Sequence, residues 1–287
     1  MSKPDMAAAE HFMAADGRIV DRRRFDRLFA DGSAVPVRDA VAAYRNTDGG
    51  FGHALEPDCR APGSQPAATE MALRIMDEAS AWDDDLVGGA LDWLQSIAPA
   101  EGGSTFVEPT IDGWPHAPWW APEDGRPASL ISTGMIAGTL HARKVSHPWL
   151  DRATELMWSR IDDLADPGPY GMRGVLGFLD HVPDRERAGQ AVARIAPALS
   201  KIVTLDPDAG GEVHSPLDFA PLPDSAARTL FSAEVIEAHL DHLVAGQHPD
   251  GGWTFNWLSW SPAADAGWRG FLTVDALCTL RANGRIG

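Results

Sequence analysis

The sequence lacks the features that mark several large protein classes. It has two cysteines, Cys59 and Cys278, too few for a disulfide framework or a four-cysteine zinc site. No apolar run approaches the ~18 residues of a membrane-spanning helix. Residues 1–16 also lack the basic start and continuous apolar stretch of a signal peptide. These absences predict a cytoplasmic protein with reduced thiols and no membrane span.

Basic residues are scarce relative to acidic ones. Lys and Arg total 24 while Asp and Glu total 41, so the net charge of the 287-residue chain is −17 at pH 7. A field of this sign repels phosphate backbones and anionic lipid heads, which argues against nucleic acid and membrane surfaces as partners. Apolar residues make up 44% of the chain, a share typical of a folded globular protein.

Short motifs of several enzyme classes are missing as well. The chain has no phosphate-binding loop, no dinucleotide-binding glycine fingerprint and no Gly-x-Ser-x-Gly elbow. Neither cysteine stands in an Asp-x-Cys or Cys-His-Gly context that would indicate a zinc-dependent transferase or cyclase. No specific cofactor is therefore indicated, a divalent cation stays open, and no metal ligand is assigned.

Helical periodicity dominates between the Gly- and Pro-rich segments. Long loops rich in Gly, Pro or Trp are expected at 48–64, 99–127 and 204–223. No shift of composition marks a linker, so the sequence predicts an all-α protein of about twelve helices in a single domain over 1–287. The expected helices are 5–16, 20–31, 36–46, 65–79, 83–97, 129–144, 148–165, 170–181, 184–203, 224–230, 232–246 and 269–283.

An internal repeat joins two distant parts of the chain. The segment Asp48-Gly49-Gly50-Phe51 precedes a helix with Thr69-x-x-Ala-Leu, and Asp250-Gly251-Gly252-Trp253 precedes one with Thr273-x-x-Ala-Leu. A weaker copy runs from Gly102-Gly103 to Ser132-Thr133. The glycines permit a tight turn with positive φ, and the small residues of the helix permit close packing. Each copy therefore predicts a Gly-rich turn followed by an inner helix.

The repeat carries a resemblance to a known family. Gln247-x-x-Asp250-Gly251-Gly252-Trp253 resembles the QW motif of squalene–hopene cyclases and of related terpene cyclases and protein prenyltransferases, and 48–52 resembles a degenerate copy. The resemblance implies an (α/α)6 toroid, with six inner and six outer helices. It also implies that the motif residues are mainly scaffold, and a shared fold does not fix an activity.

Several acidic and imidazole side chains could carry chemistry. The loop after the first turn places His53, Glu56 and Asp58 within six residues, a composition suited to acid–base catalysis or, as an alternative, to a divalent cation. His214 and Asp218 form a second group in a Pro-punctuated loop. Asp84 lies in an Asp-Asp-Asp run that resembles the acid of class II terpene cyclases, although it also suits a solvated helix N-terminus.

Aromatic residues are the expected substrate-binding groups. Their π faces stabilise cations, and indoles also stack on sugars, although core packing is the alternative for many of them. Arg269 could pair with a diphosphate or carboxylate. The predicted aromatic binding residues are Trp119, Trp120, Trp257, Trp260 and Trp268.

Together these features favour a terpene-cyclase-like enzyme of the isomerase or lyase type. It would act on a small apolar, isoprenoid-like molecule by carboxylic-acid-initiated cyclisation, isomerisation or hydration in a Trp-lined central cavity. Two alternatives stay open. One is a carbohydrate-active hydrolase or lyase with paired carboxylates, for which Glu56 or Asp58 with Asp218 would serve. The other is a non-catalytic toroid that binds a ligand or partner.

Overall fold

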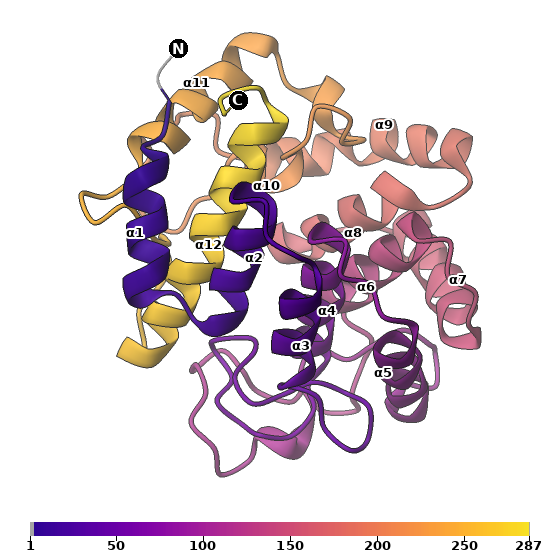
Figure 1. Ribbon diagram of the computed structural model, residues 1–287. Coiled ribbons are helices and arrows are strands. Elements are labelled where there is room, and N and C mark those ends of the chain that lie inside the picture. The colour runs from indigo at the N-terminus through magenta and orange to yellow at the C-terminus, as the bar shows by residue number, and fades with distance from the viewer. Residues whose placement is uncertain (1–2, 287) are drawn as a thin grey trace. The chain divides into compact units, whose positions relative to one another are not determined.

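The chain is all-α. The computed structural model describes residues 3–286, and these residues form twelve α-helices and two short 3-10 helices (Figure 1). Within that range there is no β-strand, and extended pairing is limited to two isolated bridges, Arg45 with Phe51 and Cys59 with His116. The all-α class predicted from periodicity is thus confirmed, while the closure of the helices into a toroid stays a prediction.

The described residues gather into two compact units. One comprises residues up to 32 together with 196 onward, and the other comprises 33–195. In the first unit lie α1 (Met6–Asp16), α2 (Ile19–Phe29), the one-turn α10 (Pro216–Phe219), η2 (Arg228–Leu230), α11 (Ala233–Ala245) and α12 (Pro262–Ala282). In the second lie α3 (Val35–Ala42), α4 (Pro66–Glu78), α5 (Asp84–Ile97), η1 (Pro109–Ile111), α6 (Leu130–Ala142), α7 (Pro148–Asp162) and α8 (Gly168–His181). The division falls within α9 (Arg185–Ile202).

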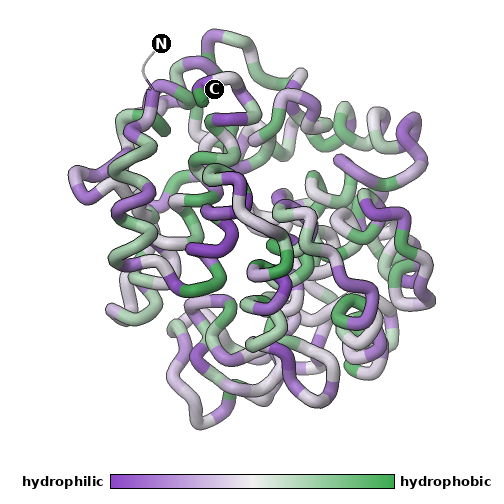
Figure 2. The backbone as a smooth tube through the Cα atoms, viewed as in Figure 1, coloured by the Kyte–Doolittle hydropathy of each residue, from purple (hydrophilic) through white to green (hydrophobic). Residues whose placement is uncertain are grey.

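Most helix bounds agree closely with the periodicity, and three differ. α3 ends at Ala42, four residues before the end of the expected helix 36–46. α12 begins at Pro262, seven residues before the expected helix 269–283, because Pro262 occupies a first-turn position that suits proline. The expected helix 224–230 is only a 3-10 turn, and the loop 204–223 contains α10 instead. Figure 2 shows hydrophilic residues interspersed along the helices, and within residues 3–286 no helix combines the length and apolarity needed to cross a membrane.

The unit formed by 33–195 contains an unusually close helix pair. A Cβ added to Gly134 of α6 would lie 2.1 Å from the carbonyl oxygen of Gly174 in α8, and one added to Gly138 would lie 2.2 Å from that of Gly177. No side chain fits at such a distance, so glycine is what lets the two backbones approach. The small-residue stripe therefore sets the spacing of the two helices.

The two strong repeat copies have the same backbone geometry. In the first, the N–H of Asn46 donates to Gly50 O at 2.8 Å and that of Gly49 to Asn46 O at 3.0 Å. In the second, the corresponding bonds join His248 and Gly252 at 2.9 Å and Gly251 and His248 at 2.8 Å. The central glycines have φ of 96° and 95°. The repeat read from the sequence is therefore also a structural repeat.

Each turn is tied to the helix that follows it. Directly after the glycines, a backbone N–H donates to the hydroxyl of a fully buried threonine on α4, α12 or α6. This bond also unites the weak third copy with the other two. The N···O pairs are Phe51–Thr69 at 3.2 Å, Trp253–Thr273 at 3.0 Å and Ser104–Thr133 at 2.9 Å.

A second helix packs over each of the two strong turns. A Cβ on Gly49 would lie 2.3 Å from Gly89 O of α5, and a Cβ on Gly251 would lie 2.0 Å from Ala8 O of α1. Gln247 fixes the latter contact, because its Oε1 accepts the N–H of Asp5 at 2.7 Å and its Nε2 donates to Asp5 O at 2.8 Å. The N-terminal helix α1 therefore completes a repeat whose turn lies near the other end of the sequence.

The hydrogen bond from the turn N–H to the buried threonine predicts that removing this threonine hydroxyl lowers stability more than removing the hydroxyl of another helical threonine. Thr273→Val leaves the buried N–H of Trp253 without its acceptor, and we expect the free energy of unfolding to fall by about 1–3 kcal/mol. Thr139→Val is the matched control, because Thr139, like Thr273, donates to the carbonyl four residues earlier but accepts no turn N–H in the described structure. Equal unfolding midpoints in urea for the two variants would contradict the role assigned to the bond.

At the C-terminal end of α6, one substitution is expected to raise the free energy of unfolding. Lys144 follows α6 with φ of 55°, and the next N–H, that of Val145, donates to Leu140 O at 3.0 Å. The left-handed conformation costs a non-glycine residue about 1–2 kcal/mol, and Lys144 is exposed. Lys144→Gly should therefore raise the free energy of unfolding by about 1 kcal/mol in urea titrations. Lys144→Ala, which keeps Cβ, should leave it nearly unchanged.

Candidate functional site

A strained turn follows the first Gly-rich turn. Its two central residues, His53 and Ala54, both have positive φ, of 55° and 62°, and the N–H of Leu55 donates to Gly52 O at 3.0 Å. This is the geometry of a type I′ turn, which glycine and asparagine normally occupy. Two non-glycine residues in this conformation cost about 1–2 kcal/mol each. Strain of this kind gathers at functional sites, which makes the turn a candidate.

The two carboxyl groups after this turn are buried. Glu56 is 6% exposed and Asp58 is 4% exposed. Oε2 of Glu56 accepts the N–H of Cys59 at 3.0 Å. The sequence predicted chemistry from these residue types, and the structure adds that both carboxyls are withdrawn from water, the condition under which enzymes obtain an acid from Glu or Asp.

The Trp-rich loop pairs with the segment that carries Asp58. The N–H of Ala117 donates to Asp58 O at 2.8 Å and that of Arg60 donates to Pro115 O at 3.0 Å, on either side of the Cys59–His116 bridge. This pairing brings together two loops that are far apart in the sequence. We call residues 52–60 and 114–120 together the paired-loop site.

Two indoles of the paired-loop site face solvent. Trp114 is 49% exposed and Trp119 is 42% exposed, whereas Trp120 is 2% exposed and packs on Phe106 with ring centroids 5.2 Å apart. Of the two tryptophans predicted in this loop, Trp119 is therefore accessible to solvent, and Trp120 belongs to the core.

His53 has a defined partner although its side chain is exposed. Its Nε2 lies 2.9 Å from Oδ1 of Asn46. Sequence reasoning did not single out Asn46 or His116. Aligning the two repeats could have drawn attention to Asn46, because it takes the place of His248 in the second copy. Nothing in the sequence indicates the bridge that brings in His116.

The remaining predicted catalytic residues occupy helix starts. Asp218 accepts the N–H and the hydroxyl of Ser215 at 2.7 and 2.9 Å, which makes it the third residue of a capping box on α10. His214, just before this cap, lies with its ring 6.2 Å from that of Phe219. Asp84 is exposed in the first turn of α5, after the capping carboxylate of Asp83. A structural role accounts for Asp218, and the position of Asp84 suits the helix dipole.

The predicted aromatic residues near the C-terminus form a packed row. Phe255 and Trp257 stack with centroids 4.7 Å apart, and Trp257 meets Trp268 edge-on at 5.3 Å. Trp260 is half-buried in the same segment. Arg269 binds Asp250 at 2.8 Å and lies over the Phe12 ring. Arg269 therefore holds the second Gly-rich turn against α1. These residues belong to the compact unit that does not contain the paired-loop site.

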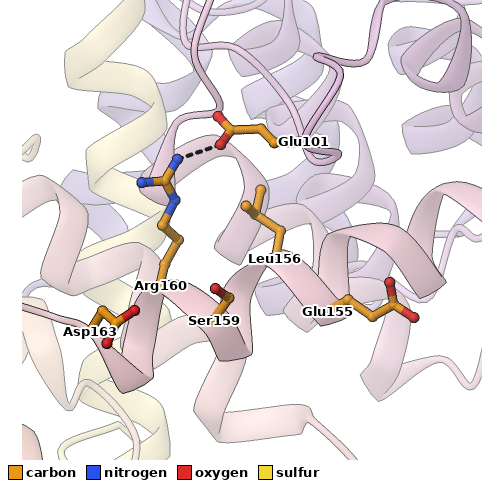
Figure 3. Close-up of a pocket in the computed structure, with 6 residues that line it drawn as sticks. All are labelled: Glu101, Glu155, Leu156, Ser159, Arg160 and Asp163. Carbon is orange, nitrogen blue, oxygen red and sulfur yellow. Dashed lines mark hydrogen bonds and ion pairs between the residues drawn. The ribbon is translucent and has the colours of Figure 1, made fainter.

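A hollow of about 520 Å³ lies on α7, and none of the predicted site residues lines it. Figure 3 shows Glu155, Leu156, Ser159 and Arg160 along one side of that helix, with Glu101 opposite and paired to Arg160 at 2.5 Å. Apart from the buried Leu156 the lining is polar and exposed. An exposed ion pair of this kind contributes little energy. The hollow lacks the aromatic lining expected of a cavity for an apolar substrate.

Metal-binding geometry is absent from the described chain. Among residues 3–286, no group of three or more His, Cys, Asp or Glu side chains is arranged to hold a metal ion.

Comparison with known proteins informs the fold. No protein family and no curated protein matches the sequence. A solved structure, the crystal structure of a protein from Actinoplanes, is similar with a TM-score of 0.60 at 16% identity, covering 97% of this chain and 99% of the other. The described fold therefore occurs in another protein over nearly its full length.

Burial gives Cys59 a pH-dependent contribution to stability. Desolvation, with smaller contributions from Glu56 and Asp58, raises the pKa of this thiol from 9.0 to about 11, against the lowering effect of a hydrogen bond with the backbone of Ala61. The folded state thus holds the proton to higher pH than the unfolded state does, and this contribution is complete below pH 9 and is lost as the pH rises toward 11. Unfolding by urea should show a steeper loss of stability over that range for the wild type than for Cys59→Ala. Parallel pH profiles would contradict the assignment.

Proposed function

We propose that the protein is an enzyme that acts on a small apolar, isoprenoid-like molecule, with Glu56 or Asp58 as the acid that starts the reaction. The observation that carries the proposal is the pair of buried carboxyls on a strained loop, next to exposed indoles. The QW-like sequence repeat supports the substrate class. We place the reaction in the cytoplasm, in keeping with Cys59 and Cys278 both being thiols within the described chain.

The acid would transfer its proton to a carbon–carbon double bond. The π electrons form the new C–H bond, the carboxyl becomes a carboxylate, and a carbocation remains on the substrate. Burial favours this role, because a carboxyl removed from water retains a proton more readily. The faces of Trp114 and Trp119 are suited to stabilise the cation, since indole rings attract positive charge. Cyclisation, isomerisation or hydration would then follow from the fate of that cation.

A carbohydrate-active enzyme is the second candidate, favoured by the same exposed indoles. Trp114 and Trp119 could stack on sugar rings, and glycosidases use two carboxyls at a fixed separation. Asp218 is less suited to be one of them, because its carboxylate is exposed and caps α10. Glu56 and Asp58 would have to supply both roles from a single loop.

Carboxyl substitution tests the proposal once a substrate is found. The protein is incubated with polyprenyl diphosphates, neutral polyenes and oligosaccharides, and products are identified by mass spectrometry. We expect conversion of an isoprenoid or polyene, and a fall in kcat of roughly 10²–10⁴-fold in Glu56→Gln or Asp58→Asn. Asp92→Asn, at a carboxylate 83% exposed on α5, is the control and should leave turnover unchanged.

Other outcomes would reject the proposal. Cleavage of an oligosaccharide would favour the carbohydrate-active reading. Binding without conversion, or no binding in the whole panel, would favour a non-catalytic protein. Full activity in both carboxyl variants would remove the role given to the loop, even if an isoprenoid were converted.

A further inference from the structure

The side chain of Asn46 has its orientation fixed by its neighbours. Its Nδ2 donates to Pro62 O at 2.9 Å and to Ser64 Oγ at 3.0 Å. A flipped amide would place Oδ1 against the Pro62 carbonyl, two acceptors facing each other, and would lose the bond to Pro62. The oxygen of the amide must therefore be the atom that faces His53.

This orientation determines the tautomer of His53. Oδ1 can only accept, so Nε2 of His53, 2.9 Å away, must carry the proton and donate it. In the neutral ring the other nitrogen, Nδ1, is then the basic one. Within the described chain Nδ1 has no hydrogen-bond partner, and the side chain is exposed. The imidazole thus presents an available base to solvent.

The network continues in one direction to a carboxylate. Ser64 Oγ accepts from Asn46 and donates to Asp48 Oδ1 at 2.7 Å, so every donor in the series from His53 points toward Asp48. Hydrogen bonds aligned in this way strengthen one another.

The second repeat lacks this series although its turn has the same backbone bonds. His248 stands where Asn46 does, and Asp250 binds Arg269 rather than a serine. The turn therefore does not need the His53–Asn46 contact for its own geometry. The His53–Asn46 contact therefore occurs in the first copy alone among the two strong copies. Its histidine lies on the loop that also carries the buried carboxyls.

We propose that His53 exchanges a proton with the substrate through Nδ1, and that Asn46 is the positioning residue that keeps the Nε2–H tautomer. This inference rests on the proposed function. After the carboxyl has protonated the substrate, Nδ1 takes a proton from the carbon next to the cation, and the C–H electron pair becomes the new double bond. The imidazolium then returns its proton through water to the carboxylate, so that both groups are restored and no proton is gained or lost.

Alkylation with bromoacetate tests the tautomer without any substrate. The unprotonated ring nitrogen displaces bromide and forms the new C–N bond, and the ring proton then leaves to water. The His53 peptide is isolated, and the two carboxymethyl isomers are separated and compared with standards. We expect the Nδ1 product to dominate in the wild type, with the exposed His11 as the internal reference for reagent access.

Variants of the network make the test specific. Asn46→Ala removes the acceptor, and the ratio of Nδ1 to Nε2 product should fall roughly two- to tenfold, the effect of one ordinary hydrogen bond. Ser64→Ala is the matched control, because Pro62 O still holds the amide, and it should change the ratio little.

The outcomes distinguish this inference from the proposed function. A dominant Nε2 product in the wild type, an unreactive His53 beside a reactive His11, or an unchanged ratio in Asn46→Ala would each overturn it. The wild-type ratio decides the question even if Asn46→Ala does not fold. Failure to convert any isoprenoid would instead count against the proposed function, and it would leave the alkylation ratio as it is.

Discussion

The repeat depends on one hydrogen bond, from the N–H after each Gly-rich turn to a buried threonine hydroxyl. That N–H is removed from water and has no neighbour in a strand or helix to pair with, so an acceptor must be supplied. The threonine supplies it from the following helix, which fixes the turn relative to that helix. The glycines then let another helix cover the turn from outside. The loop that leaves the first turn therefore starts from a rigid point, which allows it to hold buried carboxyls.

The two strong repeat copies show how a scaffold and a site can share the same residues. Asp48 and Asp250 both accept the N–H of the second glycine. Their second partners differ, since Asp250 binds Arg269 and stabilises packing against α1, whereas Asp48 receives the hydroxyl of Ser64. The resemblance to QW motifs implied that these residues are mainly scaffold, and Arg269 fits that description. In the first copy Asp48 is connected through Ser64 and Asn46 to the exposed imidazole of His53. The aspartate that holds the turn therefore also ends this series of hydrogen bonds.

How much the sequence could predict depended on whether the signal was local. The helices expected at 65–79 and 83–97 are present as Pro66–Glu78 and Asp84–Ile97, because apolar spacing and first-turn residues mark both. The repeat could be recognised because both copies place a Gly-Gly pair and a threonine at similar spacing. The early start of α12 was missed, because residues 262–268 contain almost no large apolar side chains that could show helical spacing. The Cys59–His116 bridge and the contact between Asn46 and His53 join segments through space, and no local pattern encodes them.

The strained turn at His53 and Ala54 bears on the role proposed for the loop. Glycine at positions 53 and 54 would adopt the observed φ angles without steric cost, whereas histidine and alanine lose about 1–2 kcal/mol each. This cost is a sizeable part of a total stability of about 5–15 kcal/mol, and Lys144 retains the same left-handed conformation at the end of α6. Histidine at this position brings a base whose free nitrogen is set by Asn46, and a glycine would bring nothing to that contact. The conformation is what aims the ring at Asn46, so the strain and the orientation of the imidazole are two consequences of the same turn.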